Sequence, residues 1–599
     1  MTIETINNIY ELRTFTFPNP TNPPTTRLPI SGDIVYVKYH TNSWDGGGGF
    51  FTFIDIPGSE VNDRADDNGV IIQHGVKNNP PIINGRWVRK IDNYINVKFY
   101  GTIGALQSDD GDKIQSAIEC AALNKQGSYF IKGNTVFIPN GNYLINNTLL
   151  LKSGVSILGD GMDNTVLTAG YENSNSGYLI GMESGPVIGC NISNLTVTGD
   201  GQSNGPDITQ NRTKGCFFLH ASTDETNTGG IWRSTFKNIS IYNFNGTGIH
   251  LDGGGSTPDY KFNEPNQFLI FENVHIIRQK TASHCLQITG QQGQITFLNC
   301  LFDGITYDYI DKNTPQETYN IIKGFNVAIN NELNTQPAVI SFINSTFEIS
   351  EYGVYVRFAE NITFDTCWFE TLDNAVFIDP YMDNSSSAFP SKAINIINSR
   401  FANAAGFGSL RVRNLSKYNN VPTGRCITST GSESNIYNNY VVVSDLNTTY
   451  NSALNKNFIT ASANPSTPNL GIKTIGNSFQ DNRLGYSQGI TQNITILNEN
   501  INDKYIDLKD NTIVFVTGVS GNPPIKRMTS SICAGEIIEL RAENLPIKIS
   551  NAKNIYLSGK TEIILNNGDI ATFTKIDRPV DLYKEIFQLL SLYKSTSDV

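Results

Sequence analysis

Three acidic residues share one position in a short sequence pattern. Asp303, Glu348 and Glu370 each come directly after a phenylalanine. That phenylalanine is the last residue of a short unit, which consists of an apolar residue, a spacer, an Asn or Thr, two further residues and the final apolar residue. Because successive side chains of a strand point to opposite faces, an inward phenylalanine turns the next residue outward. Glycoside hydrolysis needs one carboxyl group as acid and a second as base or nucleophile. The pattern therefore predicts Asp303, Glu348 and Glu370 as catalytic residues that cut a glycan.

The spacing of these acids leaves the stereochemistry of the reaction open. In other copies of the pattern the same position holds Tyr242, Ile277 and Ala402, so the repeat itself does not require an acid there. Carboxylates on neighbouring coils of a parallel stack would lie about 4.8 Å apart, near the separation of about 5–5.5 Å in retaining enzymes. A pair that skips one coil would lie about 9.6 Å apart, near the inverting range.

Residues close to the two glutamates could bind the glycan. Trp368 points outward next to Glu370 and could stack on a sugar ring. A second strand recurs with a spacing of 22 residues and supplies the other predicted binding residues, Tyr355, Arg357, Asp373 and Asp379. The alternative is that these are solvated surface residues and that a neighbouring subunit covers Trp368. Other acids that could take the catalytic role are Asp308, Asp311, Glu317, Asp373 and Asp383.

Histidine, cysteine and metal chemistry have weaker support in the sequence. The six histidines are scattered, and His250 beside Asp252 could act as a base, although a hydrogen-bonding role at the surface is favoured. The eight cysteines show no CxxC pair or metal-ligand spacing, which predicts buried free thiols. We therefore expect no metal and no cofactor, and no Ser-His-Asp arrangement is legible.

The carboxylates belong to a degenerate repeat that fills the middle of the chain. Its copies are 192–197, 236–241, 271–276, 297–302, 342–347, 364–369, 396–401 and 436–441. They are spaced by 22 to 45 residues, and about 22 residues make one coil of a parallel β-helix, with loops in the longer intervals. Asn recurs where a bend needs the left-handed conformation. The repeat predicts a right-handed, single-stranded parallel β-helix over 96–490, in preference to a β-sandwich.

The two ends of the chain have a different pattern. Residues 110–124 have helical periodicity, with Asp110 as the expected N-cap, and a helix here would seal the open end of the β-helix. Residues 1–95 are rich in Pro and Gly with short strand-like runs, which predicts a small β-rich cap or attachment module. Alternating strands separated by Gly and Asn turns predict a C-terminal β-sandwich over 495–599, for trimerisation or carbohydrate binding.

Composition and charge exclude several classes of protein. Charged residues make up 17% of the chain and the net charge is −11, which disfavours long solvated helices and nucleic-acid binding. No run approaches 18 apolar residues, so no membrane insertion is expected. The first residues lack a basic segment followed by an apolar one, so no signal peptide is expected and synthesis in a reducing cytoplasm fits the cysteines.

The combination resembles a known family. Asp45–Phe50, Asp67–Gly69, Gly85–Trp87 and Val97–Gly101, followed by Asp109-Asp110 and the 112–122 helix, look like the beginning of bacteriophage tailspike depolymerases with a pectate-lyase-type β-helix. One departure is that 101–110 lacks the usual Gly-Asp-Gly. The resemblance implies a homotrimer, attachment to a phage tail or baseplate protein through the N-terminal module, and a place on the virion acting at the host cell surface.

Three functions stay open at this stage. Hydrolysis of a bacterial capsular polysaccharide or exopolysaccharide by a carboxylate pair is the favoured one. A polysaccharide lyase of the same fold would instead abstract a proton beside a uronate carboxyl, with Lys, Arg, Tyr or His as the base. A receptor-binding spike without catalysis would bind capsule and leave it intact.

Overall fold

We describe a computed structural model of the chain. It describes residues 3–18, 26–42, 45–56, 65–75, 85–124, 135–170, 177–183, 185–199, 215–220, 229–254, 265–278, 284–304, 325–330, 337–379, 381–382, 388–389 and 391–402, and separate strands between 427 and 594. The chain divides into two compact units, residues 1–314 with 320–350 and residues 315–319 with 351–599. Each unit is described by itself below.

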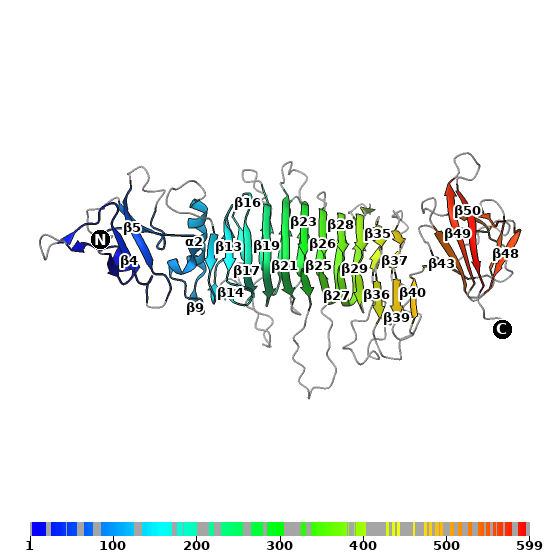
Figure 1. Ribbon diagram of the computed structural model, residues 1–599, viewed down its shortest axis with the longest axis horizontal. Coiled ribbons are helices and arrows are strands. Elements are labelled where there is room, and N and C mark those ends of the chain that lie inside the picture. The colour runs from blue at the N-terminus through cyan, green and yellow to red at the C-terminus, as the bar shows by residue number, and fades with distance from the viewer. Residues whose placement is uncertain are drawn as a thin grey trace, which may run out of the picture. The chain divides into compact units, whose positions relative to one another are not determined.

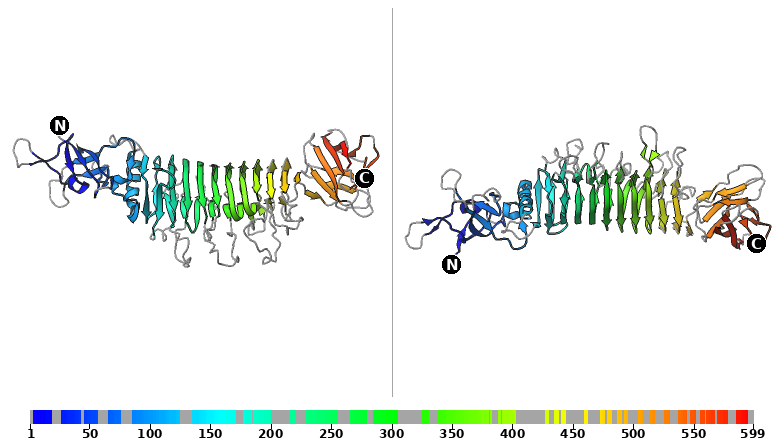
Figure 2. Two further views of the ribbon diagram at one scale, coloured as in Figure 1. Left: turned by 60° about the horizontal axis from the view of Figure 1, so that its bottom comes forward. Right: turned by 90° about the horizontal axis from the view of Figure 1, so that it is seen from above.

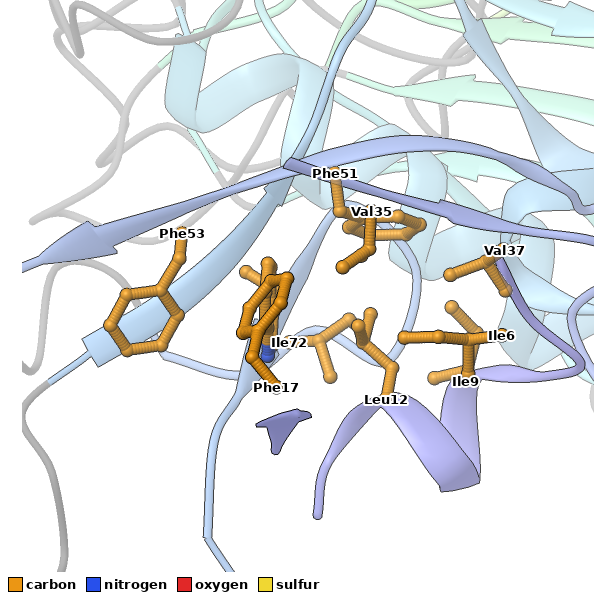
Figure 3. Close-up of a cluster of buried hydrophobic side chains, with 10 residues drawn as sticks. Ile6, Ile9, Leu12, Phe17, Val35, Val37, Phe51, Phe53 and Ile72 are labelled. Atoms are coloured by element: carbon orange, nitrogen blue, oxygen red, sulfur yellow. The ribbon is translucent and has the colours of Figure 1, made fainter. Parts of the chain in front are cut away.

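The first unit begins with a small sheet and a short helix. Its elements are β1 (Glu4–Ile6), α1 (Ile9–Leu12), β2 (Phe17–Pro18), β3 (Thr26–Arg27), β4 (Ile34–Val37), β5 (Gly49–Asp55), β6 (Ile71–Gln73) and β7 (Gly85–Arg89). Five strands pair in the order β1-β4-β5-β7-β6. Their inner face and α1 enclose a buried apolar cluster that includes Phe51, Phe53 and Trp87, most of it labelled in Figure 3. The predicted N-terminal β-rich region is therefore present as a sheet with its own core.

A helix follows at the predicted place. After β8 (Ile95–Asn96), the 3-10 helix η2 (Val97–Tyr100) and β9 (Ala105–Asp109), helix α2 spans Gly111–Asn124. Ile114, Ala117 and Ile118 of α2 are fully buried, as the helical periodicity predicted. The carboxylate of Asp110 accepts the backbone N–H groups of Ile103 and Gly104. Asp110 thus precedes the helix as expected, but its side chain ties down the preceding loop.

The rest of the first unit is a parallel β-helix. Its strands are β10 (Thr135–Ile138), β11 (Gly141–Ile145), β12 (Leu149–Leu151), β13 (Ser156–Gly159), β14 (Thr165–Ala169), β15 (Tyr178–Met182), β16 (Val187–Ile188), β17 (Asn191–Thr198), β18 (Gly215–His220), β19 (Ile231–Tyr242), β20 (Thr247–Asp252), β21 (Asn266–Ile277), β22 (His284–Thr289), β23 (Gln292–Leu298), β24 (Leu301–Asp303), β25 (Phe325–Asn330), β26 (Ala338–Ile343) and the first half of β27 (Thr346–Arg357). Each strand pairs in parallel with its equivalent in the next coil, as for β17, β19, β21 and β23 in Figure 1. Figure 2 shows the same coils from two further directions.

The recurring asparagines form the bends of the coils, as the sequence predicted. Asn194, Asn238 and Asn273 all have positive φ angles between 53° and 60°, where a short polar side chain is tolerated best. Their side chains form a ladder in which Asn238 Nδ2 donates to Asn194 Oδ1 over 2.8 Å and Asn273 Nδ2 donates to Asn238 Oδ1 over 2.9 Å. Each bend is thereby aligned with the next one along the helix.

Aromatic rings stack through the core with the period of the coils. Phe236, Phe271, Phe297 and Phe342 are buried, and consecutive rings lie 4.7–4.8 Å apart and nearly parallel. That separation matches the spacing of neighbouring strands, so each phenylalanine contacts its equivalents above and below. Stacked aromatic pairs add about 0.5–1.5 kcal/mol each beyond their burial. The scaffold that carries the outward-facing residues is therefore stiff.

The second unit continues with coils of the same kind. Its strands are the end of β27, β28 (Glu360–Asp365), β29 (Trp368–Asp379), β30 (Tyr381–Met382), β31 (Ala388–Phe389), β32 (Lys392–Ile397), β33 (Arg400–Ala402), β34 (Ile427–Ser429), β35 (Ser434–Tyr437), β36 (Tyr440–Val443), β37 (Ile459–Ala461), β38 (Ile472–Ile475), β39 (Ser478–Asp481) and β40 (Tyr486–Gly489). The rings of Tyr355 and Phe377 stack 5.9 Å apart, which confirms the register of 22 residues predicted for these two strands.

Two further sheets occupy the C-terminal part of the second unit. Their strands are β41 (Gln492–Ile494), β42 (Lys504–Asp507), β43 (Ile513–Thr517), β44 (Ile525–Thr529), β45 (Ile537–Glu543), β46 (Ile547–Ser550), β47 (Ile555–Tyr556), β48 (Glu562–Leu565), β49 (Ile570–Asp577) and β50 (Glu585–Tyr593). They pair as β41-β43-β45-β49-β50-β47 and as β42-β44-β46-β48. The predicted fold class, a parallel β-helix with small sheets at both ends of the chain, is confirmed.

Two other expectations can be compared with the described residues. Within them, six cysteines are free and buried, namely Cys120, Cys190, Cys216, Cys285, Cys300 and Cys367, as predicted. Among the helices of the described part, none is both long and apolar enough to cross a membrane.

Candidate functional site

The first of the three predicted catalytic acids is buried. Asp303 ends β24 in register with Glu348, but its side chain is only 3% exposed. Its carbonyl accepts the N–H of Arg278 over 2.7 Å, and Arg278 is itself fully buried. The register keeps Asp303 in one row with Ile277 and Glu348, which are only half-buried. The solvent exposure predicted for Asp303 is therefore not found, and a catalytic role for it stays a prediction.

The two glutamates are half-buried in separate units. Glu348 belongs to the first unit, and its backbone carbonyl accepts the side-chain N–H of Asn326 over 2.6 Å. Glu370 belongs to the second unit, where Trp368 Nε1 donates to its Oε2 over 2.9 Å. The guanidinium of Arg400 lies 4.4 Å from the centre of a Trp368 ring, so one face of the indole is already occupied. A catalytic role for either glutamate stays a prediction.

The remaining predicted residues are placed only in part. Tyr355 and Arg357 are half-buried in β27, with Tyr355 stacked on Phe377 as described above. Asp373 and Asp379 lie in β29, and their side chains are outside the described residues. The alternative acids Asp308, Asp311, Glu317 and Asp383 also lie outside the described residues.

The outward face of β18, β20 and β22 carries a group of residues that the sequence analysis did not bring together. In the strand register Phe218 lies beside His250 and His220 lies beside Asp252. His250 in turn lies beside Gln287, Asp252 beside Thr289, and Thr247 beside His284. Three of the six histidines therefore gather on one sheet within three consecutive coils. The inference that the histidines do not cluster is wrong, and His250 is more than an isolated surface residue.

Tyr178 and His250 contact each other at the centre of this face. The Tyr178 hydroxyl lies 3.4 Å from Nδ1 of His250. The Phe218 ring packs against both of them, stacked on Tyr178 at 5.0 Å and tilted against His250 at 5.1 Å. His220 meets the same phenylalanine edge-on at 4.7 Å. We call Tyr178, Phe218, His220, His250, Asp252 and Thr289 the histidine face.

Hydrogen bonds fix the imidazole of His250 on the side of its Nε2 atom. Its Nε2 lies 3.0 Å from the Thr289 hydroxyl, which donates to Oδ1 of Asp252 over 3.3 Å. On the neighbouring edge, the hydroxyl of Thr247 donates to Gln287 Oε1 over 3.3 Å. His284 lies close by, with Nδ1 at 3.3 Å from the Phe325 carbonyl.

Burial separates the proton affinities of the tyrosine and the histidine. Burial lowers the pKa of His250, the charge of Asp252 opposes this shift, and His220 adds to it. Burial also raises the pKa of Tyr178 to about 12, helped by Asp252 and opposed by a hydrogen bond with Thr247. At neutral pH the imidazole is therefore neutral and able to accept a proton, while the phenol keeps its proton and can donate it.

The backbone under the histidine face is pinned by two buried amide side chains. Asn266 Nδ2 donates to the carbonyls of Leu219 and Asp252, both over 3.2 Å. Gln292 Nε2 donates to the carbonyls of Leu251 and Thr289 over 3.2 and 2.7 Å. Both amides are almost fully buried. They tie together the ends of β18, β20 and β22, so the polar groups at these ends have little freedom to move.

One sequence signal could have revealed this face. Segments 215–220, 247–252 and 284–289 each read as a short apolar strand with polar residues at alternate positions. Aligned on their inward residues, they place Phe218, His250 and Gln287 in one row. The stretches of chain between these strands differ in length, which hides the alignment in the linear sequence. Within the described residues, no group of three or more His, Cys, Asp or Glu side chains could hold a metal ion.

Comparisons with known proteins agree with this part of the fold. Residues 94–306, which include the histidine face, match the model of the family described as Rhamnogalacturonase A/epimerase, pectate lyase-like. Alginate lyase 7 of Azotobacter vinelandii is 34% identical over 114 residues, which are 18% of this chain and 12% of that protein. Mannuronan C5-epimerase AlgE1 of the same bacterium is 29% identical over 160 residues, 25% of this chain and 10% of that protein.

The chain thus spans about a tenth of the length of these two curated relatives. Among solved structures, the tailspike protein of Acinetobacter baumannii phage AM24 is similar with a TM-score of 0.46 and 12% identity, over 80% of this chain and 66% of that chain. Residues 94–306 are thus similar to a pectate lyase-like family, and the strands in this part of the chain form a parallel β-helix.

Proposed function

We propose that the protein acts on a polysaccharide that contains uronate units, and that the histidine face abstracts the proton next to the uronate carboxyl group. The contact between a neutral imidazole and a protonated phenol, His250 and Tyr178, carries this proposal. The family match over residues 94–306, which include this face, and the similarity of the chain to an alginate lyase and to a mannuronan epimerase support it, because lyases and epimerases of uronates both begin with this proton transfer.

His250 and Tyr178 together can carry out an elimination, with one as the base and the other as the acid. Nδ1 of His250 takes the proton from C5 of the uronate, and the C5–H electron pair forms the C4=C5 double bond. The C4–O bond breaks, and Tyr178 gives its proton to the leaving glycosidic oxygen. Because the two groups touch, they serve the same face of the sugar ring, which favours syn elimination. Positioned acid–base groups of this kind contribute about 10²–10⁴-fold in rate.

This proposal places proton abstraction ahead of the hydrolysis that the sequence alone favoured. Asp303 is buried, and the carboxylate of Glu370 is engaged by the Trp368 indole. Hydrolysis at Glu348 or Glu370, and binding without cleavage, are the competing functions that the experiment below separates.

The wider biological setting is part of the same proposal. The motifs at 45–50, 67–69, 85–87 and 97–101 favour a phage tailspike that is a homotrimer, acts on the host surface polysaccharide and attaches to the tail through its N-terminal sheet. Light scattering of the purified chain tests the trimer directly, since a monomer in solution would contradict it.

The test is the identity of the products. The full chain is incubated with polymannuronate, polyguluronate, polygalacturonate and a panel of bacterial capsules, and the fragments are examined by ultraviolet absorbance and mass spectrometry. We expect unsaturated fragments from a uronate polymer, and a loss of at least about 10²-fold in Tyr178→Phe and His250→Gln. His275→Gln is the matched control, because His275 is a half-buried histidine on β21 outside this face.

Each alternative gives a different result. Inverted C5 configuration in an intact chain would indicate epimerisation by the same pair. Saturated fragments that disappear in Glu348→Gln or Glu370→Gln would indicate hydrolysis and contradict the proposal. Capsule binding without any change in the polymer would indicate a receptor-binding protein.

A further inference from the structure

The hydrogen-bond chain behind His250 determines which of its nitrogens carries the proton. The Thr289 hydroxyl donates to Asp252 Oδ1 over 3.3 Å, and the same Oδ1 accepts the N–H of Gly254 over 3.1 Å. Asp252 and Thr289 are direct partners on the parallel strands β20 and β22. The backbone pairing therefore sets their contact.

The protons and lone pairs of Asp252, Thr289 and His250 determine the direction of the hydrogen bonds between them. A threonine hydroxyl has a single proton, and a carboxylate can only accept. Since that proton goes to Asp252, Thr289 Oγ1 can only accept from His250 Nε2 at 3.0 Å. The imidazole proton is then on Nε2, and Nδ1 keeps a lone pair beside the Tyr178 hydroxyl.

We propose that Thr289 is a positioning residue that fixes His250 as the Nε2–H tautomer and so presents the lone pair of Nδ1 on the side of Tyr178. This inference rests on the proposed function, in which Nδ1 is the base. A histidine in the opposite tautomer would offer its lone pair to Thr289 and would have no free nitrogen for the substrate proton.

The rigidity of the surroundings supports this role. Asn266 bonds the carbonyl of Asp252, and Gln292 bonds the carbonyl of Thr289. Both strand ends that form the Asp252–Thr289 contact are thereby held from inside the β-helix. A threonine with a free backbone could rotate its hydroxyl toward several partners, whereas here the partners are fixed.

Four titratable groups face His250 and must be considered in any test that varies pH. They are Tyr178 on β15, His220 on β18, Asp252 on β20 itself and His284 on β22. Asp252 favours the imidazolium, and His220 disfavours it. The tautomer is therefore best measured well above the pKa of His250, where the ring is neutral.

Nitrogen NMR of the full chain tests the tautomer without reference to activity. Histidine labelled with ¹⁵N distinguishes a protonated ring nitrogen from one with a lone pair, and His250→Gln identifies the His250 signals among the six histidines. We expect Nε2–H in the unmodified protein and in Thr289→Ser, and a mixture of tautomers in Thr289→Val. Thr296→Val on β23 is the matched control and should leave the His250 signals unchanged.

Two results would overturn the inference. One is a protonated Nδ1 in the unmodified protein, and the other is an unchanged tautomer in Thr289→Val. The serine variant and the unmodified protein keep the test decisive if the valine variant fails to fold. If Nε2–H is found but no uronate polymer is modified, the tautomer assignment stands and the proposed function fails.

Kinetics give a second measurement once a substrate is known. Thr289→Val should lower kcat about 2-fold if half of the enzyme holds its base in the wrong tautomer, with little change in KM. Thr289→Ser should restore kcat. A fall in kcat that serine does not restore would assign Thr289 a packing role instead.

Discussion

The histidine face and the corner around Asp303 both carry titratable side chains on the same β-helix, yet their environments differ. On the histidine face, Tyr178, His250 and Asp252 are half-buried; Tyr178 contacts His250, and Thr289 links His250 to Asp252. At the corner, which is the end of β24 with the preceding Arg278, Asp303 and Arg278 are almost fully buried. Partial burial shifts proton affinities and still leaves access for a substrate, whereas complete burial makes a charged group part of the core.

The first prediction concerns His284, which lies at the edge of the histidine face. Burial lowers its pKa from 6.5 to about 4, so the unfolded chain binds a proton at a higher pH than the folded one does. Its contribution to stability is present above pH 6.5 and is lost as the pH falls toward 4, for a total of roughly 3 kcal/mol.

Denaturant unfolding at a series of pH values checks this effect. His284→Gln should have a weaker loss of stability between pH 6.5 and 4 than the unmodified chain. If both proteins lose stability equally over this interval, the buried histidine at this edge does not titrate as the structure implies.

The second prediction concerns the corner. Asp303→Asn keeps the shape of the side chain but removes a charge from a site that also holds the buried Arg278. We expect a loss of about 1–3 kcal/mol in the free energy of unfolding, and unchanged product chemistry. Thermal unfolding and the polymer assay measure the two outcomes separately.

The matched substitution on the histidine face is His250→Gln. We expect this variant to lose activity while its free energy of unfolding changes little, which is the opposite of the result expected for Asp303→Asn. Loss of activity in Asp303→Asn at unchanged stability would reverse this comparison. It would return Asp303 to the catalytic role that the sequence suggested.

The sequence predicted the scaffold well because the scaffold repeats. The Asn bends and the phenylalanine stack recur over several successive coils, so their spacing can be recognised in the sequence alone. The burial of Asp303 could not be predicted, because the burial of a side chain depends on residues that are distant in the sequence. The histidine face was missed because Tyr178, Phe218 and His250 come from different coils, and the stretches of chain between them are unequal in length. Only the strand register brings them together.

The last prediction is the smallest and tests whether the histidine face works as a unit. His220 lowers the pKa of His250, which burial has already lowered, and the two rings are joined through Phe218. In His220→Gln this repulsion is gone, so the pKa of His250 should rise. The acidic limb of kcat/KM, which reports the protonation of the free base, should move to higher pH by less than about one unit. An acidic limb that stays in place would mean that His220 does not influence the pKa of His250, despite their proximity on this sheet.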